Sequence, residues 1–241
     1  MKIKFSRLTS LLLASLFLNC AHANMTVYPM ALGLDNKGEG SVRIISKSND
    51  VQFIKTTVYK IDQPGTPQEK EVPVSTKDAS ALVVMPPLFA IPGGSSKLVR
   101  MISMEPTEKE VMYRVKFEGV PSPDGDESAT QKTSVATHLS VSLVWGVLVS
   151  APPVTPTINL ALSPDHHQVM NQGTQRVKIT GVGLCLPGQK NNQCHWIEEN
   201  KNIFPDSSYS LPKDSGYNHV VLKYNDWIKK TSDNTIEFDL P

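Results

Sequence analysis

Two cysteines offer the clearest chemistry in this sequence. Cys185 and Cys194 are nine positions apart and are separated by a polar loop, Gly188–Gln193. A cysteine pair of this kind forms a structural disulfide in a chain that is exported to an oxidising compartment. Zinc would require more ligands at a recognised spacing, and the adjacent His195 does not complete one. We therefore expect a Cys185–Cys194 disulfide and no metal site.

The remaining polar residues match no catalytic pattern. The sequence contains neither G-x-S-x-G nor H-E-x-x-H, and no glycine-rich loop ends in Gly-Lys-Ser/Thr. The pair His166-His167 lies in a turn rich in Pro, Asp and Gln, where surface exposure is the simpler interpretation. We expect a protein that is not an enzyme and binds no cofactor.

The N-terminus resembles an export signal. Residues 2–7 carry three basic side chains, Leu8–Leu18 supplies a short apolar core, and Ala21-His22-Ala23 fits an A-x-A cleavage site. The apolar run is too short to span a bilayer. Cys20 suggests a lipoprotein as the alternative, but the polar residue before it disfavours that cleavage. We expect residues 1–23 to be removed.

Net charge excludes one class of partner. Removal of the three basic residues of the signal lowers the count of Lys and Arg from 24 to 21, against 23 Asp and Glu, which gives a net charge of −2. A protein that binds nucleic acid through its phosphates needs a basic surface. We therefore expect no nucleic-acid partner.

Short β-branched segments closed by Pro, Gly, Asn or Asp dominate the first part of the mature chain. Such segments indicate antiparallel β-structure, and seven are the number expected of one immunoglobulin-like sandwich. No stretch carries a sustained helical period of apolar residues. The segments are Met25–Leu34, Ser41–Ser48, Val51–Ile61, Ala81–Met85, Ser96–Met104, Val111–Val120 and Val135–Val149.

A proline-rich segment, Ser150–Pro156, then interrupts the pattern. Its three prolines lack the N–H that a central strand needs, so we expect a stiff hinge. The sequence thus predicts an all-β fold with domains at residues 24–151 and 152–241. Strands expected in the second, smaller sandwich are Thr157–Leu162, Gln175–Leu184, Tyr217–Tyr224 and Thr235–Leu240.

The strand before the hinge is unusual. Val135–Val149 alternates in character over fifteen residues, which is about three times the usual strand length. Neither a charge nor a proline stands between Thr133 and Ala151, although exposed edges are normally protected by such residues. An inner strand with one buried face is the simplest alternative. Length, lack of protection and position favour an edge that a partner strand joins through main-chain hydrogen bonds.

Several motifs resemble the periplasmic pilus chaperones of the PapD-like superfamily. Val84–Arg100 resembles their D-to-E strand signature, with paired prolines, a Pro-Gly turn and a strand that ends in an apolar residue and Arg. Val111–Pro121 resembles their F strand, and Val135–Val149 resembles their donor G strand. Tyr28-Pro29, Ser46-Lys47-Ser48 and the Tyr-Arg-Val of strand F are similar to the alternate branch that serves class 5, CFA/I-like fimbriae.

The resemblance implies a fold, partners and a location. Two immunoglobulin-like sandwiches would form a boomerang in the periplasm, and their cleft would bind an incompletely folded fimbrial subunit, either the major pilin or the tip adhesin. Strand G would complete the subunit by donor-strand complementation, and an outer-membrane usher would receive it. A self-capping oligomer of the free protein is a further expectation. The donor side chains that we expect are Leu139, Val141, Leu143 and Trp145.

The resemblance also implies an anchor for the subunit's C-terminal carboxylate. In the family, one basic residue in strand A and one in strand G hold it, but neither strand contains Arg or Lys here. Because a carboxylate still favours charge-assisted contacts, we expect Arg114 and Lys116 of strand F to replace them, with Arg43 as a further candidate. Solvated surface charges are the alternative interpretation.

The same matching assigns an interdomain contact. Arg100 and Glu118 would take part in an interdomain salt bridge, although the basic partner expected near Ser150 is absent.

A two-domain exported fimbrial subunit or adhesin is the alternative function. Subunits carry an exchangeable N-terminal extension of alternating apolar residues. Here the first predicted strand follows the predicted cleavage site almost at once, which disfavours self-polymerisation.

Overall fold

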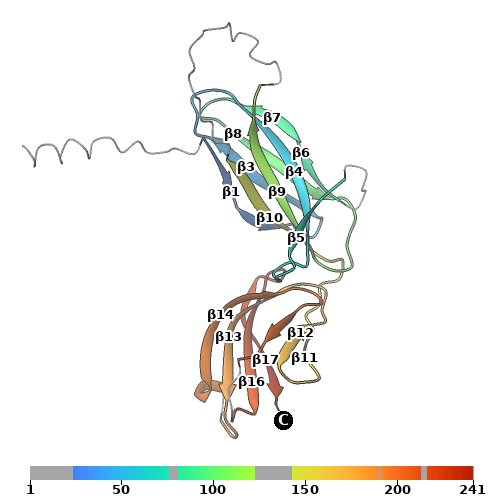
Figure 1. The fold of residues 1–241 in the computed structure, drawn as a ribbon, viewed down its shortest axis with the longest axis vertical. Helices are drawn as coiled ribbons and strands as arrows, with labels where there is room; N and C mark the ends of the chain where they lie inside the picture. The colour runs from blue at the N-terminus through green and yellow to red at the C-terminus, as the bar shows by residue number, and fades with distance from the viewer. Residues whose placement is uncertain (1–23, 76–80, 123–142, 190, 213–215, 241) are drawn as a thin grey trace, which may run out of the picture.

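Two β-sandwiches follow one another along the long axis of the molecule (Figure 1). The computed structural model describes residues 24–75, 81–122, 143–189, 191–212 and 216–240. Strands β1 to β10 build the first sandwich, and β11 to β17 build the second. Within these residues, helical structure is confined to one 3-10 turn, Asn191–Gln193. The described residues contain no helix long and apolar enough to cross a membrane.

The first sandwich consists of two sheets. One has the order β1-β3-β8-β6, with β1 at Met25–Tyr28, β3 at Glu39–Ser46, β8 at Ser96–Ser103 and β6 at Leu82–Met85. The other has the order β2-β10-β9-β4-β5, and β7 also pairs with β4. Its strands are β2 (Ala31–Gly33), β10 (Val144–Ala151), β9 (Val111–Val120), β4 (Gln52–Asp62), β5 (Lys70–Pro73) and β7 (Leu88–Ile91).

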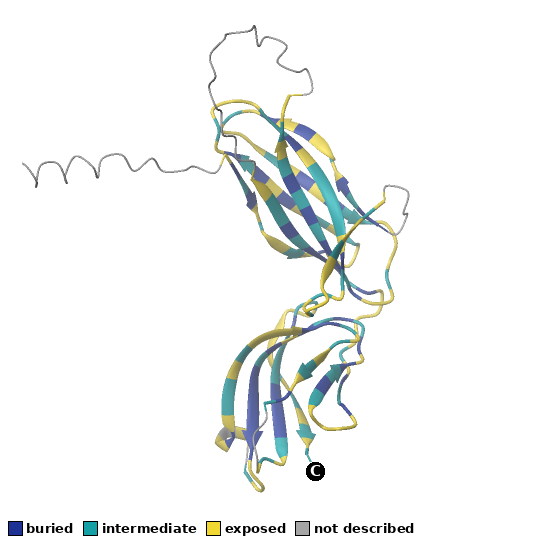
Figure 2. Cartoon of the chain, viewed as in Figure 1, coloured by how far each residue is buried: buried dark blue, intermediate teal, exposed yellow. Residues whose placement is uncertain are grey.

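The core of this sandwich lies between the two sheets. Alternate residues of the long strands β3 and β9 are buried, as the banded colouring of Figure 2 shows. Ile44 of one sheet and Ile54, Val115 and Phe117 of the other are fully buried in the same cluster. Because each such side chain contributes about 1.5–3 kcal/mol when it leaves water, this alternation fixes which face of each strand points outward.

The second sandwich pairs a small sheet with a larger one. The three-stranded sheet has the order β11-β12-β15, and the four-stranded sheet has the order β14-β13-β16-β17. Cys185, the last residue of β13, forms a disulfide with Cys194, which immediately precedes β14; this confirms the predicted pair. The bounds are β11 (Leu160–Leu162), β12 (Gln168–Asn171), β13 (Val177–Cys185), β14 (His195–Ile203), β15 (Ser208–Ser210), β16 (His219–Asp226) and β17 (Thr231–Asp239).

Two features of the first sandwich differ from the sequence-based prediction. The segment Met25–Leu34 is two strands in different sheets, because Pro29 between them has no N–H to continue a ladder. The hinge begins later than expected. Ala151 still pairs with Val111, and Pro152 is the first residue of the segment Ser150–Pro156 that lacks an N–H. Of the predicted long strand, residues 135–142 lie outside the described part of the chain.

Candidate functional site

One edge of the first sandwich is only partly covered. Strand β10 pairs with β9 along its whole length, from Val144 to Ala151. On its other side, β2 reaches only Leu148 to Ser150, where the Leu148 N–H donates to the Met30 carbonyl at 3.0 Å. Within the described residues, the outer side of β10 from Val144 to Val147 therefore has no strand partner. This open edge can accept another strand in register.

The open edge is apolar and exposed at its start. Leu143 is 50% exposed and Val144 is 49% exposed, and neither charge nor proline occurs from there to Ala151. Large apolar side chains at an unprotected edge invite pairing with another chain. In its described part, this strand therefore has the apolar edge without charge or proline that the sequence indicated.

The four predicted donor residues have different positions. Leu143 is exposed, whereas Trp145 is half-buried and packs against the core of its own sandwich opposite Phe117. The Trp145 indole N–H is buried without an acceptor among the described residues. Leu139 and Val141 lie outside the described residues. Trp145 therefore serves the core of its own sandwich in this structure, because its face of β10 continues into buried Val147.

Two cations lie beside the open edge, on the outer face of β9. Arg114 stands opposite Leu148 of β10, and Lys116 stands opposite Gly146. A Cβ at Gly146 would lie 3.2 Å from the Arg114 Cδ, so the glycine leaves room for the arginine stem. Neighbouring strands are about 4.8 Å apart. A strand added to the outer side of β10 would lie about two such spacings from β9. If that strand ended opposite Gly146, its terminal carboxylate would be within reach of the long side chains of both cations.

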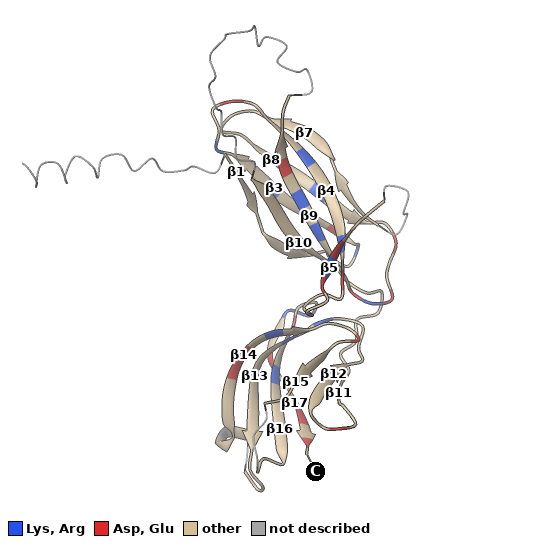
Figure 3. Ribbon diagram, viewed as in Figure 1, with Lys and Arg blue, Asp and Glu red and all other residues tan. Residues whose placement is uncertain are grey.

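Acidic residues of β5 and the turn before it already contact these cations. The Glu71 carboxylate lies 3.2 Å from Arg114 Nε and 2.6 Å from Lys116 Nζ. Glu69 lies 3.7 Å from Arg114 Nη2, and Lys116 Nζ lies 4.3 Å from the centroid of the Tyr59 ring. Figure 3 shows this juxtaposition as basic positions along β9 and acidic positions at β5.

The structure separates the third basic candidate, Arg43, from this pair. It lies on β3 in the opposite sheet, between Tyr28 and Leu98, and its Nη1 donates to Ser96 Oγ at 3.2 Å. The core lies between the two sheets, so their outer faces point in opposite directions. Arg43 therefore cannot bind the same carboxylate as Arg114 and Lys116.

The interdomain ion pair uses residues that the sequence did not identify. Arg100 lies on β8 between Ser41 and Met85, in the sheet opposite β9. Glu118 lies eight residues beyond Glu110 along β9, which places it roughly 26 Å from the junction at about 3.3 Å per residue. Neither residue forms an ion pair within the described residues, so the expected Arg100–Glu118 contribution to the junction is replaced by another contact.

That contact joins Glu110 to Arg176. The Glu110 side chain is 0% exposed and pairs with the Arg176 guanidinium, which also donates to the Ser150 hydroxyl. The Glu110 Oε2 accepts from the Arg176 backbone N–H at 2.7 Å and from the Trp227 Nε1 at 3.0 Å. The guanidinium stacks 4.6 Å from the Trp227 ring centroid. Arg176, supplied by the second sandwich, thus takes the place of the basic partner that was expected near Ser150.

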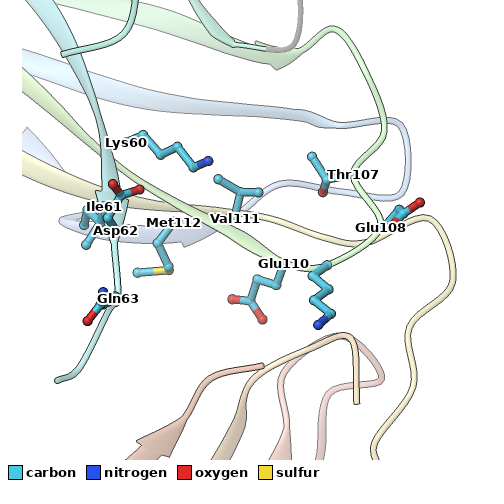
Figure 4. Close-up of a pocket in the computed structure, with 10 residues that line it drawn as sticks. Lys60, Ile61, Asp62, Gln63, Thr107, Glu108, Glu110, Val111 and Met112 are labelled. Atoms are coloured by element: carbon cyan, nitrogen blue, oxygen red, sulfur yellow. The ribbon is translucent and has the colours of Figure 1, made fainter. Parts of the chain in front are cut away.

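Further contacts surround this ion pair. Phe204 of the second sandwich is buried with Ile61 and Met112 of the first. A Cβ at Gly33 would lie 2.1 Å from Trp227, so only glycine permits this approach. A pocket of about 370 Å³ lies next to Glu110, and Figure 4 shows Glu110 directed from the end of the first sandwich towards the second. The two sandwiches are therefore joined by specific side-chain contacts in addition to the connecting chain.

An open β-edge beside two cations, on two firmly joined sandwiches, defines a protein that binds another chain by strand addition. Comparison with known proteins specifies the class further. The sequence profile of the pili and flagellar-assembly chaperones, PapD N-terminal domain, matches residues 30–146. One CFA/I fimbrial subunit of Escherichia coli is 32% identical over 225 residues, which cover 92% of each chain. One CS1 fimbrial subunit of Escherichia coli is 32% identical and covers 84% of this chain and 86% of its own.

Solved structures agree with this assignment. The class 5 fimbriae chaperone CfaA is similar with a TM-score of 0.77 and 28% identity, over 90% of this chain and 99% of that one. A chain from a chaperone–tip adhesin complex of CFA/I fimbriae is similar with a TM-score of 0.73 and 28% identity, with the same coverage. The chain belongs to the PapD-like family of pilus-assembly chaperones. Its two immunoglobulin-like sandwiches are the fold of that family.

Proposed function

We propose that this protein acts in the periplasm as a chaperone that binds fimbrial subunits by lending them the open edge of β10. The uncovered, uncharged edge from Val144 to Val147, with the exposed Leu143 just before it, carries this proposal. In this scheme, residues 1–23 are the export signal, and residues 24–151 and 152–241 are the two domains. Fimbrial subunits, including the tip adhesin, are the cargo, and an outer-membrane usher receives them.

We assign the apolar contacts of the lent strand to Leu139, Val141 and Leu143. Burial of three aliphatic side chains contributes about 1.5–3 kcal/mol each, and ordering of both partners offsets part of this gain. Such an interaction can hold a folding subunit and still release it when another strand replaces β10. Trp145 defines the end of the lent segment, because its ring returns to the chaperone's own core.

We assign the subunit's C-terminal carboxylate to Arg114 and Lys116. Their position one strand in from the open edge supports this role, since an added strand and its terminus would approach both features together. A carboxylate between an arginine and a lysine gains charge-assisted hydrogen bonds. Both side chains are partly exposed, which reduces the gain through solvent screening.

Co-expression with the major subunit of a class 5 fimbria tests the proposed function. We expect a soluble complex with one copy of each chain, and loss of soluble subunit when this protein is omitted. Size-exclusion chromatography with mass measurement would establish the stoichiometry. Polymerisation of this protein alone into surface fibres would instead support the alternative of a fimbrial subunit or adhesin; the names of its curated relatives contain the words fimbrial subunit.

Alanine substitution of Arg114 or Lys116 tests the carboxylate anchor. We expect each change to weaken subunit binding about fivefold to thirtyfold, the equivalent of about 1–2 kcal/mol for a partly exposed charged contact. The free energy of unfolding of the free protein should change by less than about 1 kcal/mol. Arg43→Ala, a basic residue on the opposite sheet, is the matched control and should bind like wild type. Unchanged binding by Arg114→Ala and Lys116→Ala would remove both residues from the site.

A further inference from the structure

Glu71 contacts both cations of the proposed carboxylate anchor. One carboxylate oxygen lies 3.2 Å from Arg114 Nε and the other lies 2.6 Å from Lys116 Nζ. The acid comes from β5, which lies beyond β4, whereas the open edge of β10 lies on the other side of β9. Glu71 therefore contacts these cations across β4. Lys116 Nζ lies over the Tyr59 ring of β4, whereas the Arg114 stem lies beside Gly146 of β10.

The contact between Glu71 and Arg114 is an ion pair of limited quality. The Arg114 Nε is buried, but its approach to Glu71 lacks the alignment of a hydrogen bond, so no acceptor satisfies it among the described residues. A buried guanidinium N–H gains most from an aligned, bidentate carboxylate. A different carboxylate that approached with better alignment could therefore replace Glu71 on Arg114.

The neighbouring acid is held differently. The Oε2 of Glu69 accepts a hydrogen bond from the Gly65 N–H at 2.8 Å, so this carboxylate also closes the turn before β5. Its distance to Arg114 is 3.7 Å, the longest of the three acid–base contacts. Among the described residues, Glu71 contacts only the two cations through its carboxylate. Among the described residues, Glu71 can move away from the cations without breaking another hydrogen bond of its carboxylate, whereas Glu69 would lose its hydrogen bond with the Gly65 N–H.

We propose that Glu71 is an intramolecular competitor that occupies the Arg114–Lys116 anchor in the free protein and yields it to the subunit's C-terminal carboxylate. This inference rests on the proposed function of that anchor. While Glu71 is in place, it neutralises both cations, so a carboxylate gains little unless the rest of its chain is already paired with β10. The acid would thus favour subunits whose strand and terminus bind together over isolated carboxylates.

The substitution Glu71→Gln tests the competitor while it preserves side-chain size. The probe is the purified major subunit of a class 5 fimbria, diluted from denaturant into the chaperone. We expect Glu71→Gln to bind this subunit about fivefold to twentyfold more tightly than wild type, because two ion pairs no longer need to break. Glu69→Gln is the matched control and should change the affinity less than about twofold.

A second probe establishes that the effect acts through the terminal carboxylate. The same subunit with two glycines added at its C-terminus displaces that group from the anchor. The advantage of Glu71→Gln should disappear with the extended subunit. Equal or weaker binding of the original subunit by Glu71→Gln would overturn the proposal and make Glu71 a positioning residue for the cations. No binding by wild type at all would instead refute the proposed function.

Discussion

A chaperone with Leu143→Glu is expected to lose at least about tenfold in subunit affinity while it remains folded. The side chain is 50% exposed in the free protein, so its replacement removes little of the protein's own core. In the complex it would lie in an apolar groove, where loss of the aliphatic contact alone costs about 1.5–3 kcal/mol and a carboxylate adds a desolvation penalty. Val141→Glu, two residues earlier in the proposed lent strand, should have the same effect.

Recovery of soluble subunit during co-expression would measure this loss, and urea unfolding would measure the stability of each free variant. Leu186→Glu is the matched control: Leu186 is 44% exposed, but it lies in the second sandwich beside the disulfide. This variant should retain subunit binding. If Leu143→Glu and Val141→Glu both recovered as much subunit as wild type, β10 would not be the lent strand. Unfolding of both variants at lower urea than Leu186→Glu would show that these side chains support the free protein's fold.

Local patterns in the sequence predicted most of the long strands, although not β14, and they predicted the open edge. Val111–Val120 is a strand with the expected bounds, because its apolar alternation and flanking residues specify it without help from distant residues. The edge was apparent because Leu143 to Ala151 contains no charge or proline. The short strands β5 and β7 were missed, since four residues carry too weak a periodic signal and both strands depend on pairing with β4.

The partners of the charged residues could not be predicted in the same way. Glu110 and Arg176 are separated by 66 positions, and no local pattern marks either as a junction residue. Arg43 was predicted as a further anchor candidate from its charge, and Arg100 was predicted as an interdomain residue from the family resemblance, but the strand order places both in the sheet opposite β9. Glu71 escaped notice because β5 itself was not expected. Each of these contacts depends on which strands become neighbours, and the sequence of one chain does not encode that locally.

The junction between the sandwiches determines how the open edge and the second domain face a shared partner. A boomerang-shaped chaperone can bind a subunit with both domains only if their angle is maintained. Interfaces between domains of one chain are often small and polar, and motion is then the default. Here a buried carboxylate, a guanidinium and an indole meet at one point, and an apolar contact through Phe204 adjoins them. We therefore expect the junction to be rigid.

The substitution Arg176→Ala is expected to destabilise the junction more than any surface change. It would leave Glu110, whose side chain is 0% exposed, without its cation, and removal of one partner of a buried pair costs about 3–5 kcal/mol. The Trp227 N–H remains as a donor to Glu110, which places the expected loss near the lower end of that range. Urea unfolding should shift to lower midpoint or split into two transitions, because the sandwiches would no longer unfold together.

A second interdomain ion pair provides the control for this experiment. Lys109 lies next to Glu110 and pairs with Asp206 at 2.6 Å, but these side chains are 48% and 68% exposed. Lys109→Ala should therefore cost less than about 1 kcal/mol. Small-angle scattering should show a broader distribution of interdomain distances for Arg176→Ala and no such broadening for Lys109→Ala, and only the former should lose subunit affinity. Equal unfolding curves for the two variants would mean that the buried pair does not hold the sandwiches together. The angle of the boomerang would then depend on the apolar contact of Phe204 with Ile61 and Met112.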